Sequence, residues 1–213
     1  MPSALNMPFT TEQFFDVFEK YNSTVFPLQF IIIASGAAAL FLLHSRHTLK
    51  NKFIGSYLGL LWIWMGTAYH ISFFTEINKA AYLFGAMFIL QGLLILMNTF
   101  IKDRLIFTFS LQPKDYFGYF FILFGLIIYP ITGYLTEGSY ARTIALGLPC
   151  PSTIFTFGFL LLTSIKFPKY LLIIPSLWAV VGLSAAINFG VYQDYMILIA
   201  AATADYYLIK RRS

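Results

Sequence analysis

Long apolar segments separated by short polar ones repeat along the whole chain. Each apolar segment has roughly 20 residues, the length of α-helix that crosses the hydrocarbon core of a bilayer. The pattern predicts an all-α bundle of seven transmembrane spans, at about 24–43, 54–75, 80–101, 116–135, 143–165, 168–187 and 190–209. The last two spans meet at Asn188, Phe189 and Gly190 with no charged residue between them, so a six-span arrangement stays open.

Before the first span, residues 10–22 have the pattern of a short amphipathic helix. Thr10 and Gln13 have the spacing of a capping box, and aromatic residues recur on one face at helical intervals. We expect this helix to lie flat on the outer membrane surface. No long polar linker interrupts the sequence, which predicts one integral membrane domain over residues 1–213.

The composition supports a membrane protein and gives its orientation. Hydrophobic residues make up 59% of the chain and charged residues 11%, too few to coat a soluble globule. With the N-terminus outside and the C-terminus inside, eleven of the fourteen Lys and Arg residues fall in cytoplasmic segments, as the positive-inside rule requires. The eleven are Arg46, Lys50, Lys52, Lys102, Arg104, Lys114, Lys166, Lys169, Lys210, Arg211 and Arg212. The net charge of +5 therefore reflects topology, and we expect the lipid bilayer and no nucleic acid as partner.

The fifth predicted span contains an unusual break at Pro149, Cys150 and Pro151. Proline lacks an amide hydrogen and pushes the residue before it out of the α region, so no helix is expected to run through this point. A helix starting at Pro151 is too short to cross, and residues 143–150 must then cover the remaining depth as irregular backbone lining a pocket. Cys150, the only cysteine, would sit at the helix end, where free amides favour a thiolate or a bound anion.

Few ionisable side chains lie within the predicted spans, so each is a candidate for function. His70, Cys150 and Asp194 fall at the same outer depth on three different spans. With Tyr129 and Gln193 they predict an outward-facing polar pocket. Simpler interpretations remain. His70 could bond a backbone carbonyl, Asp194 could interact with the positive end of a helix dipole, and Cys150 could act only as a small apolar side chain.

One further carboxylate, Asp205, lies near the inner end of the last span, and we expect it to pair with Lys210 or Arg211. The glycines at 55, 59, 66, 85, 92, 118, 125 and 133 predict close packing between helices.

Three kinds of function fit these observations. The first is binding or transport of a small solute or metal ion, with Cys150 and His70 as ligands for a soft metal. The second is an intramembrane enzyme with Cys150 as nucleophile, His70 as base and Asp194 orienting the histidine. The third is a structural or accessory membrane protein. The sequence names no cofactor, and homo-oligomerisation is compatible with so small a domain.

Several segments together resemble a family of bacterial multi-pass inner-membrane proteins of unknown function. They are 7-MPFTTEQFFDVFEKYN-22, 68-AYHISFFTEINKAAYLFG-85, 147-GLPCPSTIFTFGFLLL-162, 174-IPSLWAVVG-182 and 192-YQD-194, of which the Gly-Leu-Pro-Cys-Pro motif is the most specific. The resemblance covers nearly the whole chain and implies the bacterial inner membrane as location. It implies no activity, so the chemistry depends on the residues themselves.

Overall fold

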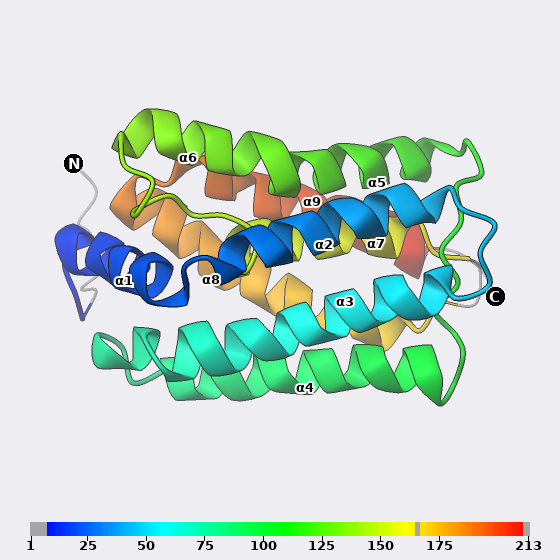
Figure 1. The fold of residues 1–213 in the computed structure, drawn as a ribbon, viewed down its shortest axis with the longest axis horizontal. Helices are drawn as coiled ribbons and strands as arrows, with labels where there is room; N and C mark the ends of the chain where they lie inside the picture. The colour runs from blue at the N-terminus through cyan, green and yellow to red at the C-terminus, as the bar shows by residue number, and fades with distance from the viewer. Residues whose placement is uncertain (1–7, 165–166, 211–213) are drawn as a thin grey trace.

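The computed structural model describes residues 8–164 and 167–210, and within these ranges the chain forms helices and no extended strand (Figure 1). The α-helices are α1 (Thr11–Val25), α2 (Leu28–Leu43), α3 (Lys50–Trp64), α4 (Ala81–Phe100), α5 (Pro113–Leu123), α6 (Tyr129–Glu137), α7 (Pro149–Leu161), α8 (Ile173–Phe189) and α9 (Tyr195–Ile209). Short turns of other helix types are Met65–Ile71 and Phe124–Ile128, which are π-helical, and Phe74–Glu76, Lys169–Leu172 and Tyr192–Asp194, which are 3₁₀. The predicted all-α class is confirmed.

Among the residues that the structure describes, three continuous helical segments are long and apolar enough to cross a membrane: Ala81–Phe100, Pro113–Glu137 and Lys169–Phe189. A fourth arises if α1 and α2, which meet at an angle of 87°, count as one bent span. The remaining helices lie alongside these segments in one bundle, with α1 at one end of it (Figure 1). The predicted spans overlap helices of this bundle, but the fifth, predicted at 143–165, contains a helix of only 13 residues, α7. The number of membrane crossings remains a prediction.

Helix α7 is the central helix, since every residue of it except Cys150 is buried. Glycines let neighbouring helices of the bundle approach one another closely, as predicted. A Cβ atom placed on Gly158 would lie 2.7 Å from the carbonyl oxygen of Gly118 in α5. A Cβ on Gly92 of α4 would lie 2.5 Å from the carbonyl oxygen of Gly59 in α3. In both pairs the backbones touch, so any side chain would force the helices apart.

Prolines shape two of the segments in different ways. Pro130 is the second residue of α6 and follows the π-helical turn Phe124–Ile128, since its missing amide interrupts the ordinary hydrogen-bond ladder. Pro175 falls in the first turn of α8, where a helix needs no amide donor. Pro130 is therefore accommodated by a widened turn, and Pro175 by the start of a helix.

The amphipathic helix predicted at 10–22 is α1, and its capping box is confirmed. The Thr10 hydroxyl accepts from the Gln13 amide at 3.2 Å, and the Gln13 side chain accepts from the Thr10 amide at 2.9 Å. Its apolar face, including Phe14, Phe18 and Tyr21, is buried. Phe14 stacks on Phe189 at the end of α8, with ring centroids 4.4 Å apart. That face was expected to rest on lipid, and instead it covers the end of the bundle.

Candidate functional site

Cys150 lies in the first turn of α7, where irregular backbone becomes helix. Gly147 has a φ of +103°, a left-handed conformation that favours glycine, and Pro149 stands in the first turn, where its missing amide costs nothing. The break is where the sequence predicted it, but the helix begins at Pro149 rather than at Pro151. Cys150 is therefore inside the first turn and its side chain projects from the helix.

The amides of this first turn are partly occupied, contrary to the expectation of a free anion-binding end. The Ser152 amide donates to the carbonyl of Leu148 at 3.3 Å. The Ser152 hydroxyl in turn accepts from the amide of Gly147 at 2.9 Å. This closed turn is a cap made by the protein itself, so the Ser152 amide is not available to a ligand.

The irregular backbone before Pro149 is held by side chains of α1. The Tyr21 hydroxyl donates to the carbonyl of Gly147 at 3.2 Å. The Asn22 amide group donates to the carbonyls of Ala141 and Thr143 at 2.7 and 2.9 Å. Buried backbone that leaves a helix requires such partners, because an unpaired carbonyl or amide there costs free energy. Helix α1 therefore stabilises the loop that positions Cys150.

Cys150 of α7, Tyr129 of α6 and Asp194 of the 3₁₀ turn Tyr192–Asp194 come together. Asp194 precedes the first residue of α9, yet its side chain makes no capping bond to the helix. Its carboxyl instead accepts a short hydrogen bond from the Tyr129 hydroxyl and interacts with the Cys150 thiol. Asp194 and Tyr129 are buried, whereas Cys150 is half-buried. The dipole interpretation of Asp194 is therefore set aside, and the adjacent carboxyl does not favour a thiolate at Cys150.

His70 occupies a different environment, in the π-helical turn that follows α3. Its imidazole is fully buried, and neither ring nitrogen has a hydrogen-bond partner among the described residues. The ring instead packs edge-on against Phe88 and Trp178, with centroids 4.6 and 5.1 Å away. No hydrogen bond to a backbone carbonyl or to Cys150 is formed, so His70 has the surroundings of a neutral, structural side chain.

Replacing His70 with phenylalanine is expected to leave the free energy of unfolding unchanged or to raise it. The substitution removes two unpartnered buried nitrogens and loses no hydrogen bond. Thermal unfolding of the detergent-solubilised protein measures the effect. Gln91→Met is the matched control, because it breaks the bond from Gln91 to the Leu171 carbonyl at 2.8 Å and should cost about 1–3 kcal/mol. Destabilisation of His70→Phe as large as that of the control would contradict the assignment.

Gln193 and Asp205 lie apart from the Cys150 cluster. Gln193 lines a small hollow with Glu137 and Arg142 at the end of the bundle. Asp205 accepts from the Ser176 hydroxyl of α8 at 3.1 and 3.2 Å. The predicted pairing of Asp205 with Lys210 is not formed, because the Lys210 ammonium contacts the ring and hydroxyl of Tyr206. Arg211, the other expected partner, is outside the described residues.

A cavity of about 230 Å³ opens beside Cys150 between α1 and α8. Its wall is mostly aromatic, where the sequence predicted a polar pocket. The rings are those of Phe9, Phe14, Phe18, Tyr69, Phe74, Phe84, Trp178 and Phe189. The thiol of Cys150 and the side chains of Asn78 and Ser184 supply the few polar groups. The arrangement suits a mainly apolar molecule better than a hydrated ion.

Ion pairs fasten α1 over this cavity. Arg142, in the loop before α7, binds Glu12, Asp16 and Glu19 of α1 at 2.7, 2.9 and 2.9 Å. These hydrogen bonds, led by Glu12 and Glu19, raise the pKa of Arg142 above its ordinary value. On the other side, Lys20 pairs with Glu76 at 2.6 Å. The acidic face of α1 is thus paired with the loops around the cavity.

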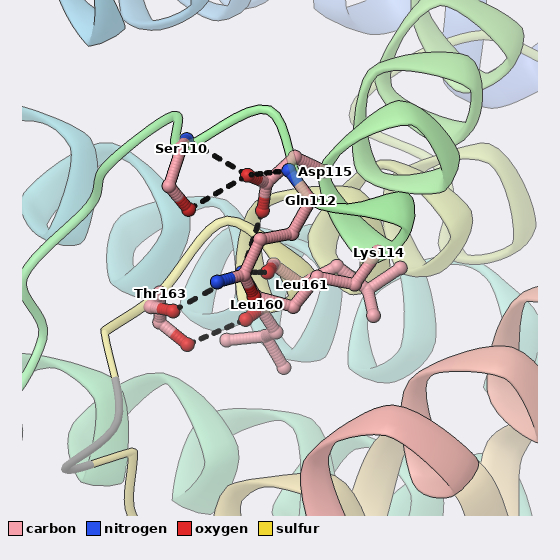
Figure 2. Close-up of polar contacts among 7 residues, drawn as sticks. All are labelled: Ser110, Gln112, Lys114, Asp115, Leu160, Leu161 and Thr163. Carbon is pink, nitrogen blue, oxygen red and sulfur yellow. Dashed lines mark hydrogen bonds and ion pairs between the residues drawn. The ribbon is translucent and has the colours of Figure 1, made fainter.

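A buried charge pair that sequence analysis missed lies at the opposite end of α7 (Figure 2). The Lys114 ammonium binds the Asp115 carboxylate at 2.6 Å and makes a short hydrogen bond to the carbonyl of Leu161. The other carboxylate oxygen of Asp115 accepts from the amide and hydroxyl of Ser110 at 2.8 and 2.9 Å. Lys114 was counted as a loop charge, although the spacing of Gln112 and Asp115, a capping box in the structure, was a signal for this site.

The described residues contain no group of three or more His, Cys, Asp or Glu side chains able to hold a metal ion. Neither ring nitrogen of His70 makes a hydrogen bond among these residues, so His70 and Cys150, the expected metal ligands, are not joined by one.

Together, the fold and the site define an all-α bundle with a few membrane-length apolar helices and an aromatic cavity at one end. The chain belongs to the family of unknown function DUF6064, whose model matches residues 11–213. No curated protein matches it. No solved structure matches it either.

Proposed function

We propose that this protein is a multi-pass membrane protein that binds a small, mainly apolar molecule in the cavity between α1 and α8. The observation that carries the proposal is the ring-lined volume of about 230 Å³ beside the half-buried Cys150. An apolar cavity of about 150 Å³ is already able to hold benzene. The cavity therefore has room for a ligand with one aromatic ring or a compact aliphatic group.

The proposed membrane insertion has seven spans, formed by α2, α3 with its π-turn, α4, α5 with α6, α7, α8 and α9. Large apolar side chains on these helices face outwards, for example Phe41, Leu83 and Val180, which are 79%, 62% and 65% exposed. Such side chains suit contact with lipid. The distribution of Lys and Arg favours an outer N-terminus, an inner C-terminus and, with the family resemblance, a bacterial inner membrane.

Within the cavity, we assign the polar end of the ligand to the side chains of Cys150, Asn78 and Ser184, which line it. The Asp194 carboxyl does not line the cavity; it is fixed by the Tyr129 hydroxyl and interacts with the Cys150 thiol, and so orients that thiol. The site is less suited to a metal ion, because the imidazole of His70 packs against aromatic rings and does not provide a second ligand beside Cys150. The same separation removes the base that a Cys150 nucleophile would need.

Modification of Cys150, the only cysteine, tests this proposal. A small aromatic maleimide should label it in right-side-out vesicles, and Val181→Phe should slow the labelling at least tenfold by placing a ring in the cavity. Val180→Phe is the matched control, because its side chain is 65% exposed on the same helix. Labelling is followed by mass spectrometry of the intact chain.

Two results would contradict the proposal. Equal rates in Val181→Phe and Val180→Phe would mean that the maleimide reaches Cys150 by a route other than the cavity. A membrane-impermeant maleimide that labels Cys150 faster in inverted vesicles than in right-side-out vesicles would reverse the proposed orientation.

A further inference from the structure

A second apolar hollow, distinct from the cavity beside Cys150, lies where α2 and α6 diverge. It has a volume of about 270 Å³ and lies between Phe30 and Ile33 of α2 and Ile131 and Leu135 of α6. A neighbouring hollow of about 260 Å³ continues it towards Ser23. Asn22 and Tyr140 line both hollows, so the two are adjacent, and we refer to them together as the trough.

The trough changes in polarity along its length. Its deep part has aliphatic and aromatic walls, and the rings of Phe30 and Tyr140 stack there with centroids 6.2 Å apart. Its outer part has Asn22, Ser23 and Ala141 beside the rings of Phe26 and Tyr140. None of the residues that line either hollow is charged. A molecule that fits must have an apolar tail and an uncharged polar end.

Gln29 gives a second, independent sign of a ligand. It lines the deep hollow, is 5% exposed, and donates through its Nε2 atom to the Asn22 carbonyl at 2.6 Å. Its Oε1 atom is buried and has no hydrogen-bond partner among the described residues. Buried acceptors without a partner are rare in folded proteins, because each costs free energy. A hydroxyl donor on a bound molecule would satisfy this oxygen.

We propose that the trough binds a neutral acylglycerol of the surrounding bilayer, with one acyl chain between α2 and α6. The glycerol hydroxyls lie at Asn22 and Gln29, and the chain lies against Ile33, Ile131 and Leu135. The uncharged lining selects this class over lipids recognised by their phosphate or ammonium groups. The inference rests on the proposed membrane insertion and is independent of the ligand of the cavity beside Cys150.

Photolabelling of the detergent-solubilised protein tests the site directly. A monoacylglycerol carrying a diazirine in its acyl chain should label peptides from α2 and α6, and excess monoolein should reduce that labelling at least fivefold. Ile33→Trp fills the deep hollow and should reduce labelling to the same degree. Ile199→Trp is the matched control, because Ile199 is 53% exposed on α9, away from the trough. Ala145→Leu provides a second filling variant on the opposite wall, should Ile33→Trp fail to fold.

The role of Gln29 has its own test. Gln29→Leu should weaken competition by monoolein at least fivefold and leave competition by methyl oleate, which has no hydroxyl, unchanged. Equal weakening of both competitors would overturn the assigned orientation. Labelling spread evenly over the outward-facing helices, or crosslinks to a second copy of the chain through α2 and α6, would overturn the site itself. The rate of Cys150 labelling should be unchanged in Ile33→Trp, since filling the trough does not block the cavity beside Cys150.

Discussion

Replacing Asp115 with alanine is expected to lower the free energy of unfolding by about 3–5 kcal/mol, because the Lys114 ammonium then stays buried without its carboxylate. The side chains of this pair are only 4% and 0% exposed. The change also removes the acceptor for the Ser110 amide and hydroxyl. Denaturation of the solubilised protein in mixed micelles, followed by circular dichroism, measures the loss.

An exposed carboxylate provides the control for this experiment. Glu12, whose side chain is 70% exposed, also forms an ion pair, with Arg142, and Glu12→Ala should cost less than about 1 kcal/mol. Replacing both members of the buried pair, as Lys114→Met with Asp115→Asn, should recover part of the stability, since no buried charge remains. A cost for Asp115→Ala no larger than that for Glu12→Ala would show that water reaches the pair.

Gly158→Leu is expected to prevent α5 and α7 from packing, with loss of the folded bundle. Already a Cβ atom at this position would lie 2.7 Å from the Gly118 carbonyl oxygen and 2.8 Å from the Ile122 amide nitrogen, and these backbone atoms have little freedom to move. Gly158→Ala should therefore cost about 1–3 kcal/mol, and leucine more. The yield of monodisperse protein after solubilisation, together with thermal unfolding, measures both variants.

Gly133 is the matched control on α6. A Cβ atom there would have no neighbour closer than Gln193 Nε2 at 3.5 Å. Gly133→Ala should then stabilise the helix by roughly 0.5–1 kcal/mol, because alanine loses less conformational freedom than glycine. If Gly158→Ala were as well tolerated as Gly133→Ala, the close approach of α5 and α7 would not contribute to the fold.

Local features of the sequence determined most of the secondary structure. The lengths of the apolar segments predict the helices. A helix that is apolar on every face appears in the sequence as one uninterrupted apolar segment. Thr10 and Gln13 predict the start of α1, because a capping box needs only residues of the same turn. The prolines flanking Cys150 predict the break before α7, because their effect on the backbone is covalent.

The sequence also predicted part of the candidate site. Cys150 and Asp194 were expected at the same depth, and Tyr129 was expected beside them, because span length and position fix depth. The structure brings these three side chains together. Depth alone does not give rotation about the helix axis, however. His70 was expected at the same depth, but its ring packs against Phe88 and Trp178, and Gln193 lines the hollow beside Arg142.

Only the tertiary structure decided how the elements cover one another. The pattern of α1 shows an apolar and an acidic face, but whether the apolar face meets lipid or protein depends on the 87° bend after it and on the pairing of Arg142 with three carboxylates. Lys114 is a loop charge by sequence and a buried ion in the fold, because its partners on α7 are far away in the chain. The apolar runs fix which segments are helices, and contacts between distant residues fix which of their side chains meet.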